Sequence, residues 1–383
     1  MKKVCKSILL LGLVSSLFAT SFKVGALLPL SGRMGDLGKR TLDGMRWIYQ
    51  YYNRFKTGDN IKILTVDNQS DKIATKNAYS KLVYENKVVA VEGPLISENA
   101  VVIKRIADAT FTPTVTPFAT DKRATAGSKV ASRVSFVDVF EAEAAARYAI
   151  KNKVKKVAIF ADMKQGYSVR LTSIFRNTLH KIKKYGVLTK VLFISTGQKN
   201  FSSQISALAQ FKPDFIYLPL YAPEAAMIVR GIRKAGIDAT ILGSSGIGDA
   251  FYFSKLAGIA ANGVLYTSPF DYSRPPTPLS KRFIREFKAK YHRLPGPYEA
   301  TGVDAYLLIY YALAKCDNSQ NKASLQKLRK CVAWNIRHAR HIEGVTGYIT
   351  INPRTGNPVS KSVYIEEIAN GKPVFVDMFK PNR

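Results

Sequence analysis

The stretch FKVGALLPLSGRMGDLGKRTLDGM, residues 22–45, contains the pattern that decides the fold. Its apolar run at 24–28 has the length of a buried strand. A glycine-rich turn follows at 29–38, and apolar and aromatic residues then recur at helical spacing from Leu42 to Tyr52. Strand, glycine-rich loop and helix open a βαβ unit, and ligands of such sheets bind at the carboxyl ends of the strands. We therefore expect this loop to form one side of a small-molecule site.

The same alternation of short apolar strands and amphipathic helices continues through most of the chain. In a first series, strands are predicted at 61–66, 88–91 and 114–116, and helices at 71–85 and 98–109. After a break near 133–139, a second series has helices at 141–152, 167–184, 201–211 and 223–235 and strands at 156–161, 187–195, 215–218, 240–242 and 263–266. This alternation predicts parallel sheets covered by helices on both faces. The fold class is α/β, with two doubly wound, Rossmann-like halves.

A third phase begins after the proline-rich segment 273–278. Helices are predicted at 279–291, 297–315 and 323–334, and we expect them to pack back on the first half because they cannot easily build a domain alone. Residues 347–351 and 363–367 are predicted to form a hairpin or two edge strands around a turn at 352–357. The chain then crosses between the halves several times, which is how a hinge is built.

The first 21 residues have the three parts of a secretory signal peptide. Lys2, Lys3 and Lys6 precede an apolar segment that is too short to span a bilayer, and Ala19 and Ser21 form a small-residue cleavage site. We expect cleavage near Ser21 and export through the inner membrane to the periplasm. The alternative, a membrane anchor, is disfavoured because the first strand follows directly.

The chain is strongly basic. Its 58 lysine and arginine residues against 27 acidic residues give a formal net charge of +31. Such a charge favours acidic partners such as nucleic acid, anionic lipid or cell wall. The basic residues are nevertheless dispersed along predicted helices, and the sequence has no arginine-rich arm, zinc-finger spacing or aromatic RNA-binding motif. We interpret the charge as a solvated basic surface and expect no nucleic-acid partner.

Two cysteines, Cys316 and Cys331, follow the predicted signal peptide. An even number of cysteines in an exported chain suggests a disulfide, here between two helices. In the chain-entropy model, closing a loop of this size stabilises the fold by about 3 kcal/mol.

Motifs for catalysis are scarce. The sequence has no GxSxG nucleophile elbow and no GxxxxGK[ST] phosphate loop. His338 and His341 would share the face of a helix, but a metal needs a third ligand, and we interpret them as a surface pair. The glycines at 243–248 have a plain use in a strand-to-helix turn. We expect no enzyme activity, no catalytic residue, no metal and no cofactor.

Loops at the predicted strand ends instead carry hydroxyl groups and aromatic rings. Ser97 opens a helix whose N-terminus suits a carboxylate, and Thr120 ends the next strand. Tyr167 and Tyr221 occupy corresponding places in the second half. Taken singly, each residue fits helix capping or packing better than ligand binding. Taken as a recurring set, they favour a cleft in which both halves contact one ligand.

Six segments carry a family resemblance: KVGALLPLSG at 23–32, GPLISENA at 93–100, TPTVTPFATD at 112–121, QGYSVRL at 165–171, YLPLYAPEAAMIVR at 217–230 and EGVTGYITIN at 343–352. Through their order and spacing, the chain resembles the type I periplasmic binding proteins of the leucine/isoleucine/valine-binding kind, the extracellular receptors of ABC importers. The resemblance implies two lobes joined by a three-segment hinge. Lobe 1 would comprise residues 22–136 and 269–352, and lobe 2 residues 137–268 and 353–383.

The resemblance also implies where the ligand binds. Its α-carboxylate and α-ammonium would be held mainly by the first lobe, through Ser97, Thr120 and the main-chain carbonyl of Phe118. Tyr167 and Tyr221 of the second lobe would close over it. The remaining positions are Leu37 in the first loop, facing the ligand, and Ser245 in the segment LGSSGIG.

Ser245 departs from the family pattern. Relatives that bind amino acids commonly have an acidic residue there, which pairs with the ammonium group. Asp249, four residues on, is a possible substitute. A buried ammonium without a carboxylate partner is costly, so an amide or a carboxylate without an amine stays open as the ligand.

The resemblance thus predicts a monomeric substrate-binding protein that captures a small polar ligand, such as an amino acid, and delivers it to an ABC permease in the inner membrane. A binding protein that serves a sensor is the first alternative. An exported enzyme on a Rossmann-like fold and a nucleic-acid binder are the others, and they find less support in the motifs.

Overall fold

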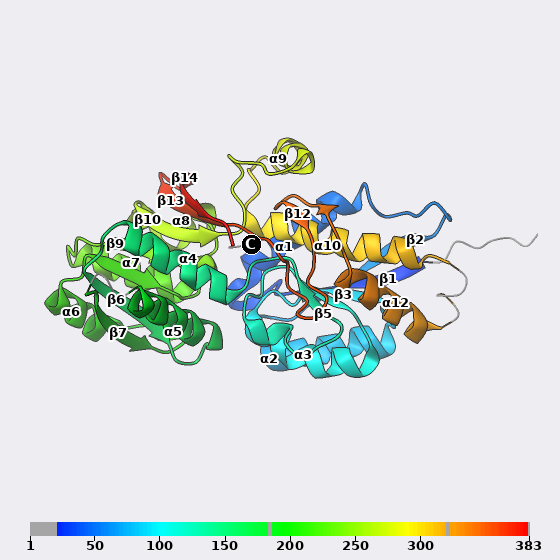
Figure 1. The fold of residues 1–383 in the computed structure, drawn as a ribbon, viewed down its shortest axis with the longest axis horizontal. Helices are drawn as coiled ribbons and strands as arrows, with labels where there is room; N and C mark the ends of the chain where they lie inside the picture. Colours follow the sequence, from blue (N-terminus) through cyan, green and yellow to red (C-terminus); the bar gives the residue numbers. More distant parts are fainter. Residues whose placement is uncertain (1–20, 183–185, 319–321, 323, 382–383) are drawn as a thin grey trace, which may run out of the picture.

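The protein was analysed as a computed structural model that describes residues 21–182, 186–318, 322 and 324–381. Apart from Ser21, the predicted signal peptide lies outside the described residues. The described chain forms two α/β lobes that lie side by side (Figure 1). None of the helices in these ranges has the length and apolar character needed to cross a membrane.

The first lobe is built on a parallel sheet with the strand order β2-β1-β3-β4-β5. Its strands are β1 (Ser21–Leu28), β2 (Asn60–Asp67), β3 (Ala90–Glu92), β4 (Thr114–Thr116) and β5 (Ala131–Arg133). The helices between them are α1 (Gly35–Tyr49), α2 (Lys72–Ser80) and α3 (Ser97–Thr110), with a π-helical turn η2 (Lys81–Glu85) after α2. Strand β1 lies inside the sheet, which explains why its run at 24–28 is apolar and buried.

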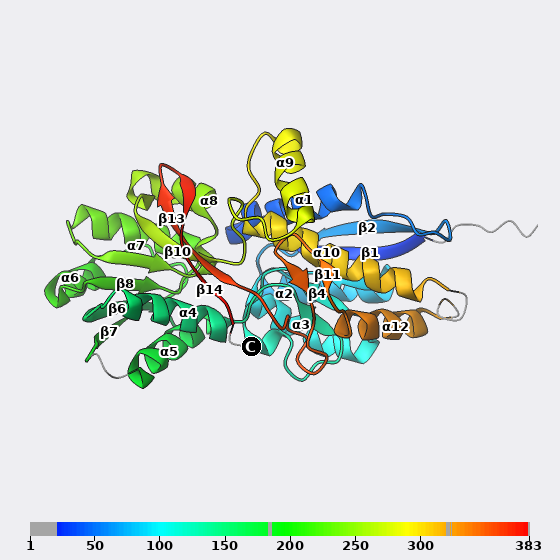
Figure 2. The same ribbon diagram turned by 45° about the horizontal axis from the view of Figure 1, so that its top comes forward.

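Three later helices return to the first lobe, as Figures 1 and 2 show: α9 (Pro278–Tyr291), α10 (Pro297–Cys316) and α12 (Leu325–Arg337). Helix α10 packs closely along α1. Glycines allow this approach: a Cβ on Gly44 would lie 2.0 Å from the carbonyl oxygen of Glu299, and one on Gly302 would lie 2.4 Å from that of Thr41. A disulfide between Cys316 and Cys331 joins α10 to α12.

The second lobe is built on a mixed sheet with the strand order β14-β13-β10-β9-β8-β6-β7. The parallel strands are β6 (Lys156–Asp162), β7 (Leu188–Ile194), β8 (Phe215–Leu218), β9 (Thr240–Gly243) and β10 (Val264–Ser268). The helices are α4 (Asp138–Lys151), α5 (Gly166–Lys181), α6 (Ser202–Phe211), α7 (Ala222–Lys234) and α8 (Ala250–Ala257). The α/β fold with two lobes predicted from the sequence is therefore confirmed.

The pairing of the C-terminal strands differs from the prediction. Strand β12 (Tyr348–Ile349) pairs with β11 (Ile342–Glu343), not with the segment at 363–367. That segment belongs to β13 (Val363–Ala369), which forms a hairpin with β14 (Lys372–Phe379) and pairs antiparallel with β10. The hairpin turns at Asn370 and Gly371, whose φ angles are 49° and 72°. Two consecutive left-handed residues match the twist of antiparallel strands. The turn predicted at 352–357 also forms, with the Asn352 amide donating to the Asn357 carbonyl at 2.8 Å, but it pairs Ile351 with Pro358 and not with the segment at 363–367.

The chain passes between the lobes after β5, after β10 and after β12. Arg133, at the end of β5, begins the first passage, and its buried guanidinium donates to Oδ1 of Asn357 on the third passage at 2.7 Å. The same guanidinium donates to the carbonyl of Asp121 in the first lobe at 2.7 Å. Lys361, on the third passage, is buried 3.4 Å from Oδ2 of Asp304 in α10. The first and third passages are thus anchored to the first lobe by buried polar contacts.

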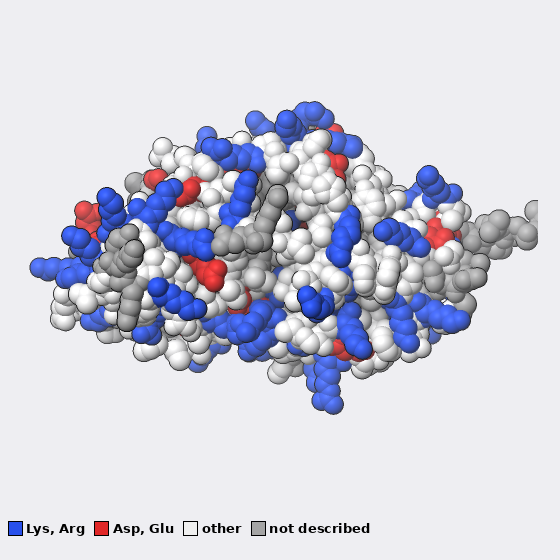
Figure 3. Space-filling model, viewed as in Figure 1, with Lys and Arg blue, Asp and Glu red and all other residues white. Residues whose placement is uncertain are grey.

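Lysine and arginine side chains spread over both lobes on the face seen in Figure 3, and acidic side chains are scattered between them. On this face, the basic residues follow no single stripe. The distribution agrees with the interpretation of the net charge of +31 as a solvated basic surface.

Candidate ligand-binding cleft

A small cavity lies between the two lobes; the empty space within it and its opening to solvent amounts to about 310 Å³. It is lined by residues from both: Met34, Leu95, Ile96, Ser97, Phe118, Thr120 and Tyr298 from the first, and Tyr167, Tyr221, Ser245 and Gly246 from the second. Apart from Tyr298, which belongs to α10, they come from segments that follow the carboxyl ends of β1, β3, β4, β6, β8 and β9. This is where ligands bind in sheets of parallel strands.

The first-lobe side of the cavity offers hydrogen-bond donors. Ser97 is the first residue of α3, and the amides of a first helical turn have no carbonyl of their own helix to bond. The Ser97 hydroxyl oxygen accepts a hydrogen bond from the Asp121 amide at 3.3 Å. Thr120 is 2% exposed, and its hydroxyl oxygen has no hydrogen-bond partner among the described residues. A buried hydroxyl without a partner, next to a helix N-terminus, suits a ligand carboxylate.

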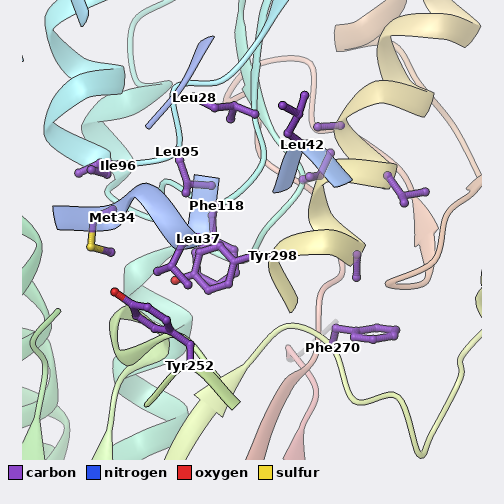
Figure 4. Close-up of a cluster of buried hydrophobic side chains, with 14 of the residues drawn as sticks. Leu28, Met34, Leu37, Leu42, Leu95, Ile96, Phe118, Tyr252, Phe270 and Tyr298 are labelled. Atoms are coloured by element: carbon purple, nitrogen blue, oxygen red, sulfur yellow. The ribbon is translucent and has the colours of Figure 1, made fainter. Parts of the chain in front are cut away.

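Apolar groups form the adjoining wall. Figure 4 shows Met34, Leu95 and Ile96 near Phe118, whose ring stacks on that of Tyr298 with centroids 4.1 Å apart. Tyr298 belongs to α10, and its hydroxyl donates across the cleft to the Ser245 carbonyl at 3.2 Å. The wall can therefore enclose an apolar group of a ligand while Tyr298 bridges the lobes.

The second-lobe side is made of phenols and a glycine turn. The rings of Tyr167 and Tyr221 stack with centroids 5.3 Å apart. The Tyr167 hydroxyl accepts from the Gly246 amide at 3.1 Å and lies 3.3 Å from Oγ of Ser245. Burial raises the pKa of Tyr167 and of Tyr221 well above the ordinary value for tyrosine, so both phenols are neutral.

A carboxyl group lies directly behind this side. Oε1 of Glu141, in α4, accepts from the Ser245 amide at 2.6 Å and from the Thr267 hydroxyl at 2.6 Å. The Tyr167 hydroxyl lies 3.5 Å from both of its oxygens. Burial raises the pKa of Glu141 to about 7, and the hydrogen bonds from Thr267 and Ser245 offset only part of that effect. Glu141 was not among the site residues predicted from the sequence. The sequence hints at it only by placing an acidic side chain in the first turn of an alanine-rich helix.

Ion pairs join the lobes around the cavity. Nη2 of Arg40 in α1 lies 2.6 Å from Oδ2 of Asp249, while its Nε lies 2.7 Å from Oε1 of Glu299. Further pairs link the lobes, among them Arg33 with Glu224 at 2.6 Å and Lys255 with Asp36 at 2.8 Å. The lobes are therefore closed on each other in this structure. These pairs join residues about 200 positions apart in sequence, so spacing within the chain could not reveal them.

The sequence-predicted site residues come together with one exception. Ser97, Phe118, Thr120, Tyr167, Tyr221 and Ser245 all line the cavity. Leu37 does not: it is buried near Phe118 and Tyr298, and its Cδ2 would lie 3.6 Å from a Cβ on Gly248 (Figure 4). Met34 lines the cavity in its place, because the chain forms a short helical turn (Gly32–Met34) before α1 begins.

Asp249 does not take the place of an acidic residue at Ser245. Its Oδ1 accepts from the Tyr252 amide and so caps α8, while its Oδ2 pairs with Arg40. The residue is absent from the lining of the cavity. The suggestion that Asp249 substitutes at the ligand is therefore wrong, since both of its oxygens are engaged in holding α8 and the closed lobes.

Comparison with known proteins agrees with this geometry. A family model described as periplasmic binding protein matches residues 21–372. The chain belongs to this family. Among solved structures, a leucine-binding protein, LivK of Thermotoga maritima, is 30% identical and superimposes with a TM-score of 0.86, covering 94% of this chain and 99% of the other.

Two curated relatives extend the comparison. The Leu/Ile/Val/Thr-binding protein of Salmonella typhimurium is 28% identical over 319 residues, which are 82% of this chain and 84% of the relative. The Leu/Ile/Val-binding protein homolog 3 of Brucella melitensis is 26% identical over 371 residues, 94% of this chain and 95% of the relative. The resemblance to the leucine/isoleucine/valine-binding kind of periplasmic binding protein is thus confirmed.

Proposed function

We propose that this periplasmic binding protein captures an amino acid with an apolar side chain and delivers it to an ABC permease. The observation that carries the proposal is the cavity between the lobes, where an unpartnered hydroxyl and a helix N-terminus adjoin an apolar wall. The names of the relatives, which specify leucine, isoleucine, valine and threonine, support the same ligand class.

Each wall has a role in this proposal. Ser97, Thr120 and the first turn of α3 bind the ligand carboxylate, and the main-chain carbonyl of Phe118 accepts from its amine. Met34, Leu95 and Ile96 contact its side chain. The hydroxyls of Tyr167 and Ser245, with Tyr221, close over it from the second lobe.

Binding and closure are one process in this proposal. Residues 22–136 with 269–352 and residues 137–268 with 353–383 move as two bodies about the three passages between the lobes. A ligand that contacts both lobes stabilises the closed form, and that form is what the permease recognises. No covalent step is involved. The mature protein acts as a monomer in the periplasm after cleavage near Ser21.

A second ligand class is favoured by one observation. All the residues that line the cavity have uncharged side chains, so no lining side chain pairs with an ammonium group. An amide or a carboxylate without an amine would meet the same first-lobe donors without needing such a pair. A role in sensing instead of transport would use the same cleft with a different membrane partner.

A thermal-shift screen tests the proposal. The mature protein is heated with each amino acid, with amides and with small carboxylates, because any ligand that binds only the folded protein raises its melting temperature by mass action. We expect the largest shift from leucine, isoleucine or valine. If no amino acid raises the melting temperature but an amide or a simple carboxylate does, the ligand belongs to the second class and the proposal of an amino acid is wrong.

A further inference from the structure

Glu141 is a fully buried carboxyl group without a cationic neighbour at hydrogen-bond distance. Among the residues that the structure describes, its partners are the Ser245 amide, the Thr267 hydroxyl and the Tyr167 hydroxyl. A buried carboxylate is costly unless it is paired with a positive charge. The N-terminus of α4 favours an acidic residue here. The two short hydrogen bonds do not require the charge, since both go to one oxygen and an amide oxygen would accept them equally well.

The carboxyl group is separated from the cavity by a single layer of atoms. Both Ser245 and Tyr167 touch it on one side and line the cavity on the other. Their hydroxyls lie 3.3 Å apart, so they connect Glu141 to the cavity through a short chain of hydrogen-bonding groups. Because Glu141 is buried, its charge is screened less by water than a surface charge would be, and its field can reach a bound ligand.

The other ionisable groups near Glu141 do not replace it. Asp138, earlier in the same helix, is paired with Arg170 at 2.7 Å. The phenols that face it come from α5, β8 and α10, and burial raises the pKa of each well above its ordinary value: Tyr167, Tyr217 and Tyr298. Burial raises the pKa of Asp138 as well, but Arg170 favours its charged form, so Glu141 is the carboxyl of this cluster without a cation at hydrogen-bond distance among the described residues.

We infer that Glu141 determines ligand specificity by selecting a ligand that carries a protonated amine, with its negative charge acting through Ser245 and Tyr167. This inference rests on the proposed function and deepens it, because it names the countercharge that the cavity lining lacks. The ligand carboxylate faces the donors of the first lobe, and its ammonium group faces Ser245 and the carboxylate behind it. Glu141 acts without touching the ligand.

The inference predicts in which direction the affinity for each ligand changes with pH, because ligand binding is linked to the protonation of Glu141. Burial places the pKa of Glu141 at about 7 in the structure without ligand. A bound ammonium group lowers that pKa, so binding of an amino acid releases a proton and its affinity rises with pH across neutrality. A bound carboxylate without an amine raises the pKa instead, so its affinity falls over the same range.

The test uses L-leucine and 4-methylpentanoate, which differ by the amino group alone. Isothermal titration calorimetry at pH values of about 6 and about 8 compares the wild-type protein with Glu141→Gln. Glu366→Gln is the matched control, since Glu366 in β13 is another buried carboxyl whose pKa burial raises, yet it lies outside the cavity lining. Thermal melts verify that both variants fold.

We expect Glu141→Gln to bind L-leucine about tenfold to 100-fold more weakly, to bind 4-methylpentanoate at least as tightly as before, and to lose both pH trends. Glu366→Gln should match the wild type. Equal weakening toward both ligands, or an unchanged preference and pH trend, would overturn the inference while amino-acid capture stands. A wild-type protein that binds 4-methylpentanoate but not L-leucine would also overturn it. Binding of neither would contradict the proposed function as well.

Discussion

Two sets of residues connect the lobes, and their chemistry differs. One set lines the cavity; the other, called the rim here, consists of the ion pairs of Arg33, Arg40 and Lys255 around it. The side chains that line the cavity are uncharged, whereas the rim is held by ion pairs of Arg33, Arg40 and Lys255 with the facing lobe. The side chains of these cations differ in exposure, from 14% for Arg40 through 37% for Arg33 to 69% for Lys255. Uncharged groups at fixed positions distinguish ligands by shape and hydrogen bonding. Ion pairs that touch no ligand change closure by the same amount for every ligand.

Removal of the buried rim cation should have the largest effect. Arg40→Met leaves Asp249 without its cation in the closed form, although Glu299 keeps Arg293. Breaking one partner from a buried pair costs about 3–5 kcal/mol, and here the open form avoids that cost because it hydrates Asp249. We expect affinity for every ligand to fall roughly 100-fold or more when measured by titration calorimetry.

Arg46→Met is the control for this experiment, because Arg46 is exposed on the same helix. It should leave the affinities unchanged. A similar loss in both variants would show that the basic character of α1, and not the ion pair, supports closure.

The buried carboxyl behind the cavity should make stability depend on pH. Since the pKa of Glu141 is raised to about 7, the folded protein binds this proton more tightly than the unfolded chain. The stabilising contribution is fully present below the unfolded pKa, near 4.5, and is lost as pH rises through the folded value, for a total of up to about 3 kcal/mol.

Urea unfolding of the ligand-free protein at pH values from about 5 to 8 measures this trend. Relative to Glu141→Gln, whose amide does not titrate, the wild type should lose free energy of unfolding as pH rises. A constant difference between the two proteins over this range would contradict the assignment of the raised pKa to Glu141.

A donor on the cavity wall should affect some ligands more than others. Ser97→Ala removes a hydroxyl beside the proposed carboxylate position, and a hydrogen bond to a charged group is worth about 1.5–3 kcal/mol. We expect leucine to bind roughly tenfold to 100-fold more weakly, while leucinamide loses less because its amide is uncharged. Ser132→Ala removes a buried hydroxyl in β5 outside the lining and serves as control. If leucine and leucinamide are weakened equally, Ser97 does not contact the carboxylate.

The exposed rim pair should have the smallest effect. Lys255→Gln breaks the pair with Asp36, whose side chain is itself 44% exposed. Solvent-exposed pairs contribute about 0–1 kcal/mol, so the affinity for L-leucine should change less than about threefold. A loss as large as that of Arg40→Met would mean that burial does not rank the rim pairs.

Much of the fold could be predicted because its determinants are local. The apolar run at 24–28 and the glycine-rich turn after it correspond to β1 and the start of α1. The turn at Asn370 and Gly371 is also local, because an Asn-Gly pair between apolar runs is a strong hairpin pattern, although the hairpin was predicted elsewhere. The error in the C-terminal pairing was therefore avoidable.

The site was less accessible to prediction because it depends on distant contacts. Family motifs placed Ser97, Thr120 and Tyr167 around one cavity, but the exchange of Leu37 for Met34 depends on how a short helical turn directs the first loop. The role of Glu141 depends on a hydrogen bond to Ser245, 104 residues away. No periodicity or spacing within one segment encodes such a contact.

The central claim is that the cavity lining determines which ligand binds, while the rim ion pairs affect the affinity for every ligand equally. The change in affinity of each variant for several ligands measures this directly. Titration calorimetry of leucine, isoleucine, valine and leucinamide is carried out with the wild type, Arg40→Met and Ser97→Ala. We expect Arg40→Met to weaken all four ligands by one common factor, and Ser97→Ala to weaken leucine, isoleucine and valine more than leucinamide. Unequal losses in Arg40→Met, or one common factor for all four ligands in Ser97→Ala, would contradict these roles of the ion pairs and the cavity lining.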